Sequence, residues 1–336
     1  MLCAHLIYYA AAAAAPPPGL ATMPQHMVLH APFTPFTTEG KLKLNCTVES
    51  IEALAAQAAA FGVTTVWVPG SMGQFDTMTL DERKALIQAW VPAAKKHGLY
   101  LIAHVGSTAI GDAVELAQHA QQVGAPALGS VPPYYETTQN AVTVASFLGR
   151  IGAAAPQLPL FYYHIPSLTR TLIKVGELFD AAVTAAPTLA GVKYVSSDAS
   201  DWFDLVQRYN SSRALMYAPE PKLSSFGLGL GRGAVLAEDF FAPTYLRMHE
   251  HFLRGHHAAA AAEQHFKLNA SNIMSEYGGS AAERSLYRAF PLTAGMVMGP
   301  GRLPQAPFEE ANWPRLHAAL EAIGFWKQLD PPHGRD

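Results

Sequence analysis

The chain has 336 residues, of which 50% are hydrophobic and 15% are charged, and its formal net charge is −3. This composition is too apolar for a disordered chain and suits a globular protein with a large core. No run of basic residues interleaved with aromatic residues is present, so we expect no nucleic-acid partner.

The first 27 residues are rich in alanine and proline, and no Lys or Arg occurs before Lys41. Secretory signals and mitochondrial transit peptides normally carry basic residues. We therefore expect a disordered or low-complexity extension over 1–27, with a targeting segment as the alternative. Cys3 and Cys46 are too few for a disulfide framework, and no segment has the ~18 apolar residues that a membrane-spanning helix needs. A cytoplasmic protein with no membrane partner is expected.

Short apolar runs alternate with longer amphipathic stretches from Met27 onward. The apolar runs are typical of buried strands, and the stretches with helical spacing are typical of helices that cover a core. The expected strands are 27–33, 63–70, 99–106, 126–133, 158–166, 188–195, 213–220 and 233–237. The expected helices are 47–62, 79–98, 112–124, 140–155, 172–186, 200–209, 222–230 and one that begins near residue 243.

These strands are continuously apolar rather than alternating, which indicates burial on both faces and hence a parallel sheet. Successive strand–helix units without a break favour a closed barrel over a doubly wound sheet. The glycine-rich piece 227–233 ends a helix instead of opening one, unlike a dinucleotide-binding loop. We predict an α/β fold: a (β/α)8 TIM barrel over 28–256, followed by a C-terminal helical appendage over 257–336.

The chemistry of such a barrel lies at the C-terminal ends of its strands, where Lys193 is the most unusual residue. It sits within the apolar run 188–195. Burial disfavours the ammonium form, so a lysine in this place can attack a ketone as a neutral amine and form a Schiff base. The alternative is a lysine at the barrel mouth that is paired with a carboxylate.

Two other strand ends could assist this lysine. Tyr163 ends the preceding strand, and its hydroxyl could relay protons to and from the carbinolamine and the imine; the alternative is an ordinary packed aromatic residue. The turn 69–73 is flanked by glycines, and its backbone N–H groups with the Ser71 hydroxyl suit a small carboxylate. His104 and His164 lack a metal-binding context, so a core role is the default for both.

Histidines also gather over 249–257, where they are His249, His251, His256 and His257. Helical neighbours one or two positions apart point in different directions. We therefore expect a solvated helix end there, and no metal site.

Several of these segments together resemble the dihydrodipicolinate synthase / N-acetylneuraminate lyase family of class I Schiff-base aldolases. The matching segments are APFTPF at 31–36, GSMGQ at 70–74, PPYY at 132–135, YHIP at 163–166 and GVK at 191–193. The resemblance runs from about residue 28 to the end of the chain. FYYHIPSLT at 161–169 and MGPGRLP at 298–304 look like the N-acetylneuraminate lyase branch of the family. Leu168 stands where dihydrodipicolinate synthases carry an arginine.

The resemblance implies that Lys193 forms an imine with the keto carbon of a 2-oxo acid, and that Tyr163 shuttles protons. It implies that Ser71 and the Met72 N–H hold the substrate carboxylate, and that Tyr135 contributes to the proton relay, from a neighbouring subunit. The residues placed at substrate-binding positions are Gly70, Ser71, Met72, Val195, Ala218, Glu220 and Ala237. Neither a metal nor an organic cofactor is implied, and a homotetramer or a dimer is expected because the family is typically tetrameric.

The chain also departs from the family pattern. The turn after the second strand has Met72 and Gln74 in place of a hydroxyl residue and a glutamate, and Val195 replaces a Thr or Ser. The segments 218–221 and 236–238, which hold the polyol chain of the sugar in the family, are altered as well. The Schiff-base residues are thus retained while the groups that select the sugar differ.

Three functions follow from this reading. The first is a lyase that cleaves a sialic acid (N-acetylneuraminate), or a related 2-oxo acid, to pyruvate and an aldehyde. The second is a 2-oxo acid dehydratase or hydratase-aldolase that uses the same lysine. The third is a catalytically silent barrel that binds a sugar acid, which would give no reduced adduct with pyruvate and borohydride.

Overall fold

The computed structural model describes residues 17–19, 21, 23–42, 44–229, 231–296 and 298–329. Most of the predicted extension over 1–27 lies outside the described residues, as do Cys3 and the side chain of Cys46. Met23, within that predicted extension, is only 3% exposed and belongs to the hydrophobic cluster that fills the barrel. At least this residue is therefore part of the folded barrel.

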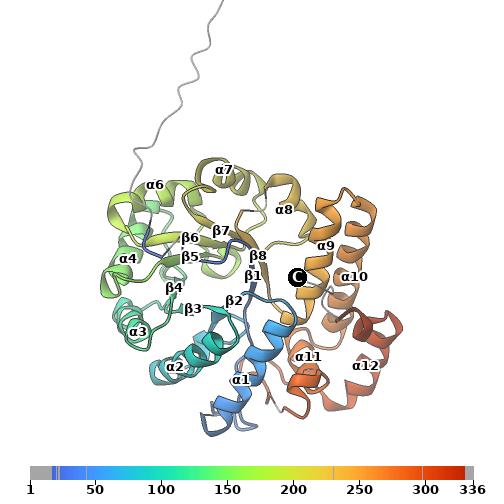
Figure 1. The fold of residues 1–336 in the computed structure, drawn as a ribbon. Coiled ribbons are helices and arrows are strands. Elements are labelled where there is room, and N and C mark those ends of the chain that lie inside the picture. Colours follow the sequence, from blue (N-terminus) through green and yellow to red (C-terminus); the bar gives the residue numbers. More distant parts are fainter. Residues whose placement is uncertain are drawn as a thin grey trace, which may run out of the picture.

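Eight parallel strands form a closed barrel in which each strand pairs with its neighbours in sequence and β8 closes on β1 (Figure 1). The strands are β1 (Met27–His30), β2 (Thr65–Val68), β3 (Tyr100–His104), β4 (Ala127–Ser130), β5 (Leu160–His164), β6 (Leu189–Tyr194), β7 (Ala214–Tyr217) and β8 (Gly233–Leu236). Every expected strand is present. Each is shorter than expected at its C-terminal end, so residues such as Gly70 and Val195 lie in the loops that follow the strands.

Helices follow the strands and surround the barrel (Figure 1). They are α1 (Leu44–Ala60), α2 (Leu80–Lys96), α3 (Ile110–Gln122), α4 (Ala141–Ala154), α6 (Val175–Ala185), α7 (Ala199–Tyr209), α8 (Leu223–Leu228) and α9 (Ala242–Leu253). The start of α2 is fixed by a capping box, in which Thr79 accepts from the Glu82 N–H and the Glu82 side chain accepts from the Thr79 N–H. A short helix, α5 (Pro166–Thr169), was not expected, and Pro166 at its first turn favours it.

The C-terminal segment lies to one side of the barrel, next to α9 and α1 (Figure 1). Its helices are α10 (His257–Glu276), α11 (Ser280–Ser285) and α12 (Trp313–Ala322). The expectation of helix throughout this segment is wrong for the described residues of 286–312, which form the short 3-10 helices η4 (Leu286–Arg288), η5 (Pro291–Thr293) and η6 (Glu310–Asn312) and loops. Its many prolines and glycines interrupt a regular helix there.

Two hydrophobic clusters account for most of the buried apolar side chains. The larger cluster lies between the strands and the surrounding helices. The smaller one fills the barrel interior, with Trp67, Phe161 and Met216 among its members. A filled interior is what a barrel of this size requires, so only the mouth of the barrel is left for binding. Among the described residues, no helix is long and apolar enough to cross a membrane.

A buried and a half-buried carboxyl group lie together where the C-terminal segment meets the barrel. Glu238 follows β8, and Glu283 lies on α11 and is hydrogen-bonded to Glu238. Burial and the neighbouring charge of Glu238 raise the pKa of Glu283 to about 8, and burial also raises the pKa of Glu238. Two carboxyl groups this close share a proton, so the pair titrates as a unit.

We expect this pair to make the fold less stable at alkaline pH. A carboxyl group whose pKa is raised on folding contributes stability that is present at low pH and lost as the pH rises through the folded-state pKa, here about 8. The free energy of unfolding should fall by about 1–3 kcal/mol between pH 6 and pH 9. In Glu283→Gln this loss should be smaller, as measured by urea unfolding at each pH. The exposed Glu276→Gln serves as the control, and an equal pH dependence in both variants would contradict the expectation.

Candidate active site

The loop that follows β2 forms a tight turn over Gly70–Gly73 with unused backbone donors. The Gln74 N–H donates to Ser71 O at 3.0 Å, and the Phe75 N–H donates to Gly70 O at 3.3 Å. The N–H groups of Ser71, Met72 and Gly73 have no acceptor among the described residues. Successive N–H groups that point out of a turn make an anion-binding concavity. The turn can therefore hold a carboxylate, as the sequence predicts.

Contacts on both sides fix the shape of this turn. Thr34, in the loop after β1, donates its hydroxyl to Gly73 O at 2.8 Å. A Cβ atom at Gly73 would lie 3.0 Å from Thr34 Oγ1 and 3.1 Å from Pro32 O, so only glycine fits without displacement. Gln74 exchanges two hydrogen bonds with the backbone of Arg302, each of 2.9 Å. The glutamine that departs from the family pattern thus attaches the C-terminal segment to this turn.

Lys193 and Tyr163 occupy paired positions on the neighbouring strands β6 and β5. Lys193 is 3% exposed, and its Nζ lies 4.0 Å from the centroid of the Tyr163 ring and 5.0 Å from that of Trp67. No ion pair within the described part of the chain includes Lys193. Its pairing with a carboxylate, which the sequence left open, is therefore not found among these residues.

The surroundings of Lys193 favour the neutral amine. Burial lowers the pKa of Lys193, and the Tyr163 hydroxyl opposes this shift only in part. The faces of aromatic rings attract a cation weakly and do not replace lost water. A neutral amine is the form that attacks a carbonyl carbon, so the environment suits the nucleophile that the sequence predicts.

The hydroxyl of Tyr163 connects this lysine to the anion-binding turn. Tyr163 Oη lies 3.4 Å from Ser71 Oγ. The tyrosine ring packs edge-on against Trp67, with ring centroids 5.4 Å apart. The fold thus brings Lys193 of β6, Tyr163 of β5 and Ser71 of the β2 loop to one place. Trp67 belongs to the same site and was missed, although its position in an apolar strand three residues before Gly70 is a usable signal.

Tyr135 does not lie at the site formed by Lys193 and Tyr163 of its own chain. Its side chain is 91% exposed, so it does not reach Lys193 of its own subunit. The adjacent Tyr134 is half-buried and packs edge-on against Phe75, at a centroid distance of 6.2 Å. A role for Tyr135 therefore stays a prediction that requires a neighbouring subunit.

The four residues predicted from the altered loops differ from one another in what surrounds them. Val195 and Ala218 pack on the interior cluster at the ends of β6 and β7. Ala237 is half-buried, and its carbonyl oxygen lies 2.8 Å from His30 Nδ1. Glu220 forms ion pairs with Lys222 at 3.0 Å and with Lys267 at 2.9 Å. Of these four residues, only Glu220 has a charged side chain, and that charge is already paired.

The histidines have mainly packing contacts. His104 is fully buried, with its ring centroid 4.3 Å from that of Phe75 and 6.2 Å from that of Tyr163. Burial lowers the pKa of His104 well below its usual value. His164 is 2% exposed and packs against Tyr162 and Tyr194. Within the described ranges, no group of three or more His, Cys, Asp and Glu side chains could hold a metal ion.

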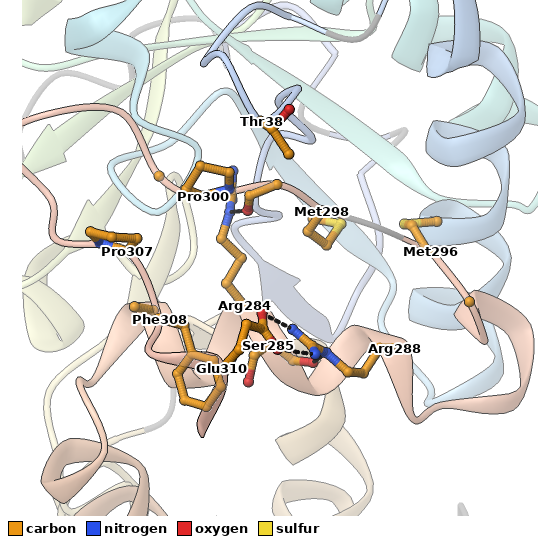
Figure 2. A pocket seen from close by; sticks show the side chains of 14 residues that line it. Thr38, Arg284, Ser285, Arg288, Met296, Met298, Pro300, Pro307, Phe308 and Glu310 are labelled. Atoms are coloured by element: carbon orange, nitrogen blue, oxygen red, sulfur yellow. Dashed lines mark hydrogen bonds and ion pairs between the residues drawn. The ribbon is translucent and has the colours of Figure 1, made fainter. Parts of the chain in front are cut away.

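A separate cavity of about 530 Å³ lies between α11 and the loops of the C-terminal segment (Figure 2). Apolar side chains such as Met296, Met298 and Phe308 line it. Arg288 pairs with Glu310 at its edge, at 2.6 Å. Neither Lys193 nor any other residue of the predicted site lines this cavity.

The sequence profile of the dihydrodipicolinate synthetase family matches residues 25–323. The chain belongs to this family. Among curated relatives, N-acetylneuraminate lyase of Rattus norvegicus is 28% identical over 88% of this chain and 91% of its own length. The enzyme of the same name from Homo sapiens is 26% identical over 90% of this chain and 94% of its own length.

Solved structures of the dihydrodipicolinate synthetase family agree with the fold. N-acetylneuraminate lyase of Proteus mirabilis superposes with a TM-score of 0.81 at 25% identity, over 89% of this chain and 99% of that one. The dihydrodipicolinate synthase of Cyanidioschyzon merolae is 24% identical and superposes with a TM-score of 0.77, over 89% of this chain and 98% of that one. The predicted barrel fold, the family and the class of enzyme, a lyase of the class I aldolase type, are confirmed. The roles of the individual residues stay predictions.

Proposed function

We propose that this protein is a Schiff-base lyase that cleaves a sialic acid, or a related 2-oxo acid, to pyruvate and an aldehyde. The main support is Lys193, a buried lysine that faces Tyr163 and pairs with no carboxylate among the described residues. The curated relatives named N-acetylneuraminate lyase support the same class of reaction.

The geometry suggests the course of the reaction. The turn at Gly70–Gly73 and the Ser71 hydroxyl bind the substrate carboxylate, which places the keto carbon near Lys193 Nζ. The neutral amine attacks this carbon, and loss of water from the carbinolamine gives a protonated imine; Tyr163 carries the protons in these steps. No metal or organic cofactor takes part in this scheme.

The imine then acts as an electron sink for carbon–carbon cleavage. Tyr163 accepts the proton of the 4-hydroxyl group, the bond between C3 and C4 breaks, and its electron pair moves to the imine nitrogen. The aldehyde leaves and an enamine stays on Lys193. Protonation of C3 by Tyr163 regenerates an imine, and hydrolysis of that imine releases pyruvate and the free lysine.

Borohydride reduction in the presence of pyruvate tests this proposal. Mass spectrometry should find one reduced three-carbon adduct per chain, located at Lys193 by peptide mapping, and none in Lys193→Ala. Equal labelling of wild type and variant would refute the mechanism, and no labelling of either would indicate a catalytically silent barrel. Pyruvate with an aldehyde as the products, rather than loss of water, would separate a lyase from a dehydratase.

Ser71→Ala should weaken binding of the substrate carboxylate. The serine hydroxyl is one of few donors there, so we expect the concentration of pyruvate that gives half-maximal adduct formation to rise about tenfold, the effect of one lost hydrogen bond to a charged group. The rate of adduct formation at saturation should change less. The exposed Ser146→Ala is the control, and an unchanged half-saturating concentration in Ser71→Ala would contradict the carboxylate role.

We further propose that the protein is a cytoplasmic homotetramer or dimer. Support comes from Tyr135 in the loop after β4, Leu168 on α5 and Leu172 in the loop after α5, which are 91%, 61% and 72% exposed. Gln139 joins the two loops through hydrogen bonds of 2.7 Å to Arg170 O and from the Leu172 N–H. Contact between subunits at this patch would cover apolar surface and bring Tyr135 near a neighbouring site. Sedimentation analysis, which compares the oligomeric state of the wild type with that of Leu172→Asp, tests whether subunits contact one another at this patch.

A further inference from the structure

The loop after β7 directs its charged groups toward one another instead of into the mouth of the barrel. Glu220 is the acidic side chain of this loop, and its side chain is 28% exposed. Oε1 accepts from Lys222 Nζ at 3.0 Å and from Lys267 Nζ at 2.9 Å. Oε2 accepts from the Lys222 N–H at 3.1 Å and from Gln264 Nε2 at 3.0 Å. A carboxylate has about four acceptor positions, so the oxygens of Glu220 are fully used.

Lys222 lies at the centre of this cluster, and its hydrogen-bond donors are also in use. Lys222 is 3% exposed, and its ammonium group donates to the carbonyl oxygens of Ala218 and Pro219 as well as to Glu220. An ammonium group has three donors, and all three have partners. The carbonyl groups at the end of β7 are thereby also occupied. Charge and hydrogen-bonding capacity in this loop are satisfied within the protein.

Apolar side chains continue the interior cluster toward the mouth at several strand ends. Val195 and Ala218 extend it at the ends of β6 and β7, and Tyr134 extends it on the β4 side. Ile165 and Val235 are buried members of the same cluster at the ends of β5 and β8. A substrate whose carboxylate lies at the β2 loop and whose keto carbon lies at Lys193 passes these surfaces as it leaves the barrel.

We propose that the aldehyde half of the substrate is short and has few hydroxyl groups, so that the protein prefers a small 4-hydroxy-2-oxo acid to a polyhydroxylated sugar acid. This inference rests on the proposed lyase function. A hydroxyl group that enters this mouth loses water and meets Val195 and Ala218, while the oxygens of Glu220 are engaged by Lys222, Lys267 and Gln264. Polar groups that are buried without partners weaken binding.

Steady-state kinetics with two substrates test the proposal. One substrate is 4-hydroxy-2-oxopentanoate, which yields pyruvate and acetaldehyde, and the other is N-acetylneuraminate; pyruvate release is measured for both. We expect kcat/KM to be about 10- to 100-fold higher for the short substrate, the factor that corresponds to one or two unpaired hydroxyl groups. A higher kcat/KM for N-acetylneuraminate would overturn the proposal. Borohydride trapping at Lys193 in the same preparation keeps the two questions apart, because a trapped adduct supports the lyase chemistry whichever substrate is preferred.

Two variants examine the role of Glu220 directly. In Glu220→Gln, with the half-buried Glu250→Gln as control, we expect the ratio of the two kcat/KM values to stay within about twofold of the wild type, because the carboxylate does not contact substrate. A selective loss of N-acetylneuraminate cleavage by about tenfold or more would show such a contact and overturn the proposal. Lys267→Met frees one acceptor position of Glu220, so it should shift the ratio toward N-acetylneuraminate by about threefold or more. An unchanged ratio in Lys267→Met would contradict the proposal.

Discussion

Lys193→Met is expected to lower kcat by about 10⁴-fold or more, because every covalent step of the proposed mechanism begins from this amine. Methionine has a similar length and fits an apolar site without a charge. The same variant should be more stable than the wild type, by about 1 kcal/mol, since Lys193 is buried without a carboxylate partner among the described residues. Pyruvate release and urea unfolding measure the two effects.

The combination of lost activity and gained stability is what identifies a functional lysine here. Lys96→Met is the matched control, because this lysine is 62% exposed and pairs with Glu52 at the surface. Its kcat and its free energy of unfolding should stay close to those of the wild type. If Lys193→Met kept a tenth of the activity, or lost several kcal/mol of stability, Lys193 would be a structural residue rather than the nucleophile.

Tyr163→Phe should lower kcat by about 10²- to 10⁴-fold, the range in which a positioned general acid and base contributes. The ring that covers Lys193 Nζ at 4.0 Å is retained, and only the hydroxyl 3.4 Å from Ser71 Oγ is removed. The lysine should therefore still form an adduct with pyruvate, but more slowly. Time courses of borohydride trapping alongside steady-state kinetics distinguish slower proton transfer from loss of the nucleophile.

The neighbouring tyrosine offers a control on the same strand. Tyr162 is fully buried, but it belongs to the cluster on the outer face of the barrel, and its hydroxyl lies 3.4 Å from His164 Nδ1. Tyr162→Phe should cost stability with little effect on kcat. A similar loss of kcat in both variants would mean that Tyr163 acts through packing and not through its hydroxyl.

Much of the fold and part of the site follow from local pattern. The eight strands, and the helix order apart from the short α5, were predicted correctly because each strand is a continuous apolar run between turn residues. Lys193 stands out within such a run, and strand pairing places Tyr163 beside it. The turn at Gly70–Gly73 was predicted from its glycines and the strand before it. In each case the relevant contacts lie within one element or between neighbouring strands.

The remaining features depend on contacts between distant segments. Tyr135, for example, is 91% exposed at the surface of the barrel. Its position in the sequence does not reveal this exposure. Glu220 is a predicted substrate-binding residue, and the partners of its oxygens include Gln264 and Lys267 of α10, more than forty positions later in the chain. The sequence by itself therefore determined the barrel and the position of its predicted nucleophile, because these rest on periodicity and on a charge placed in an apolar strand. Which polar groups at the mouth are left free to bind was decided only by the tertiary structure, since hydrogen-bonding capacity is used up by whichever partners the fold brings close.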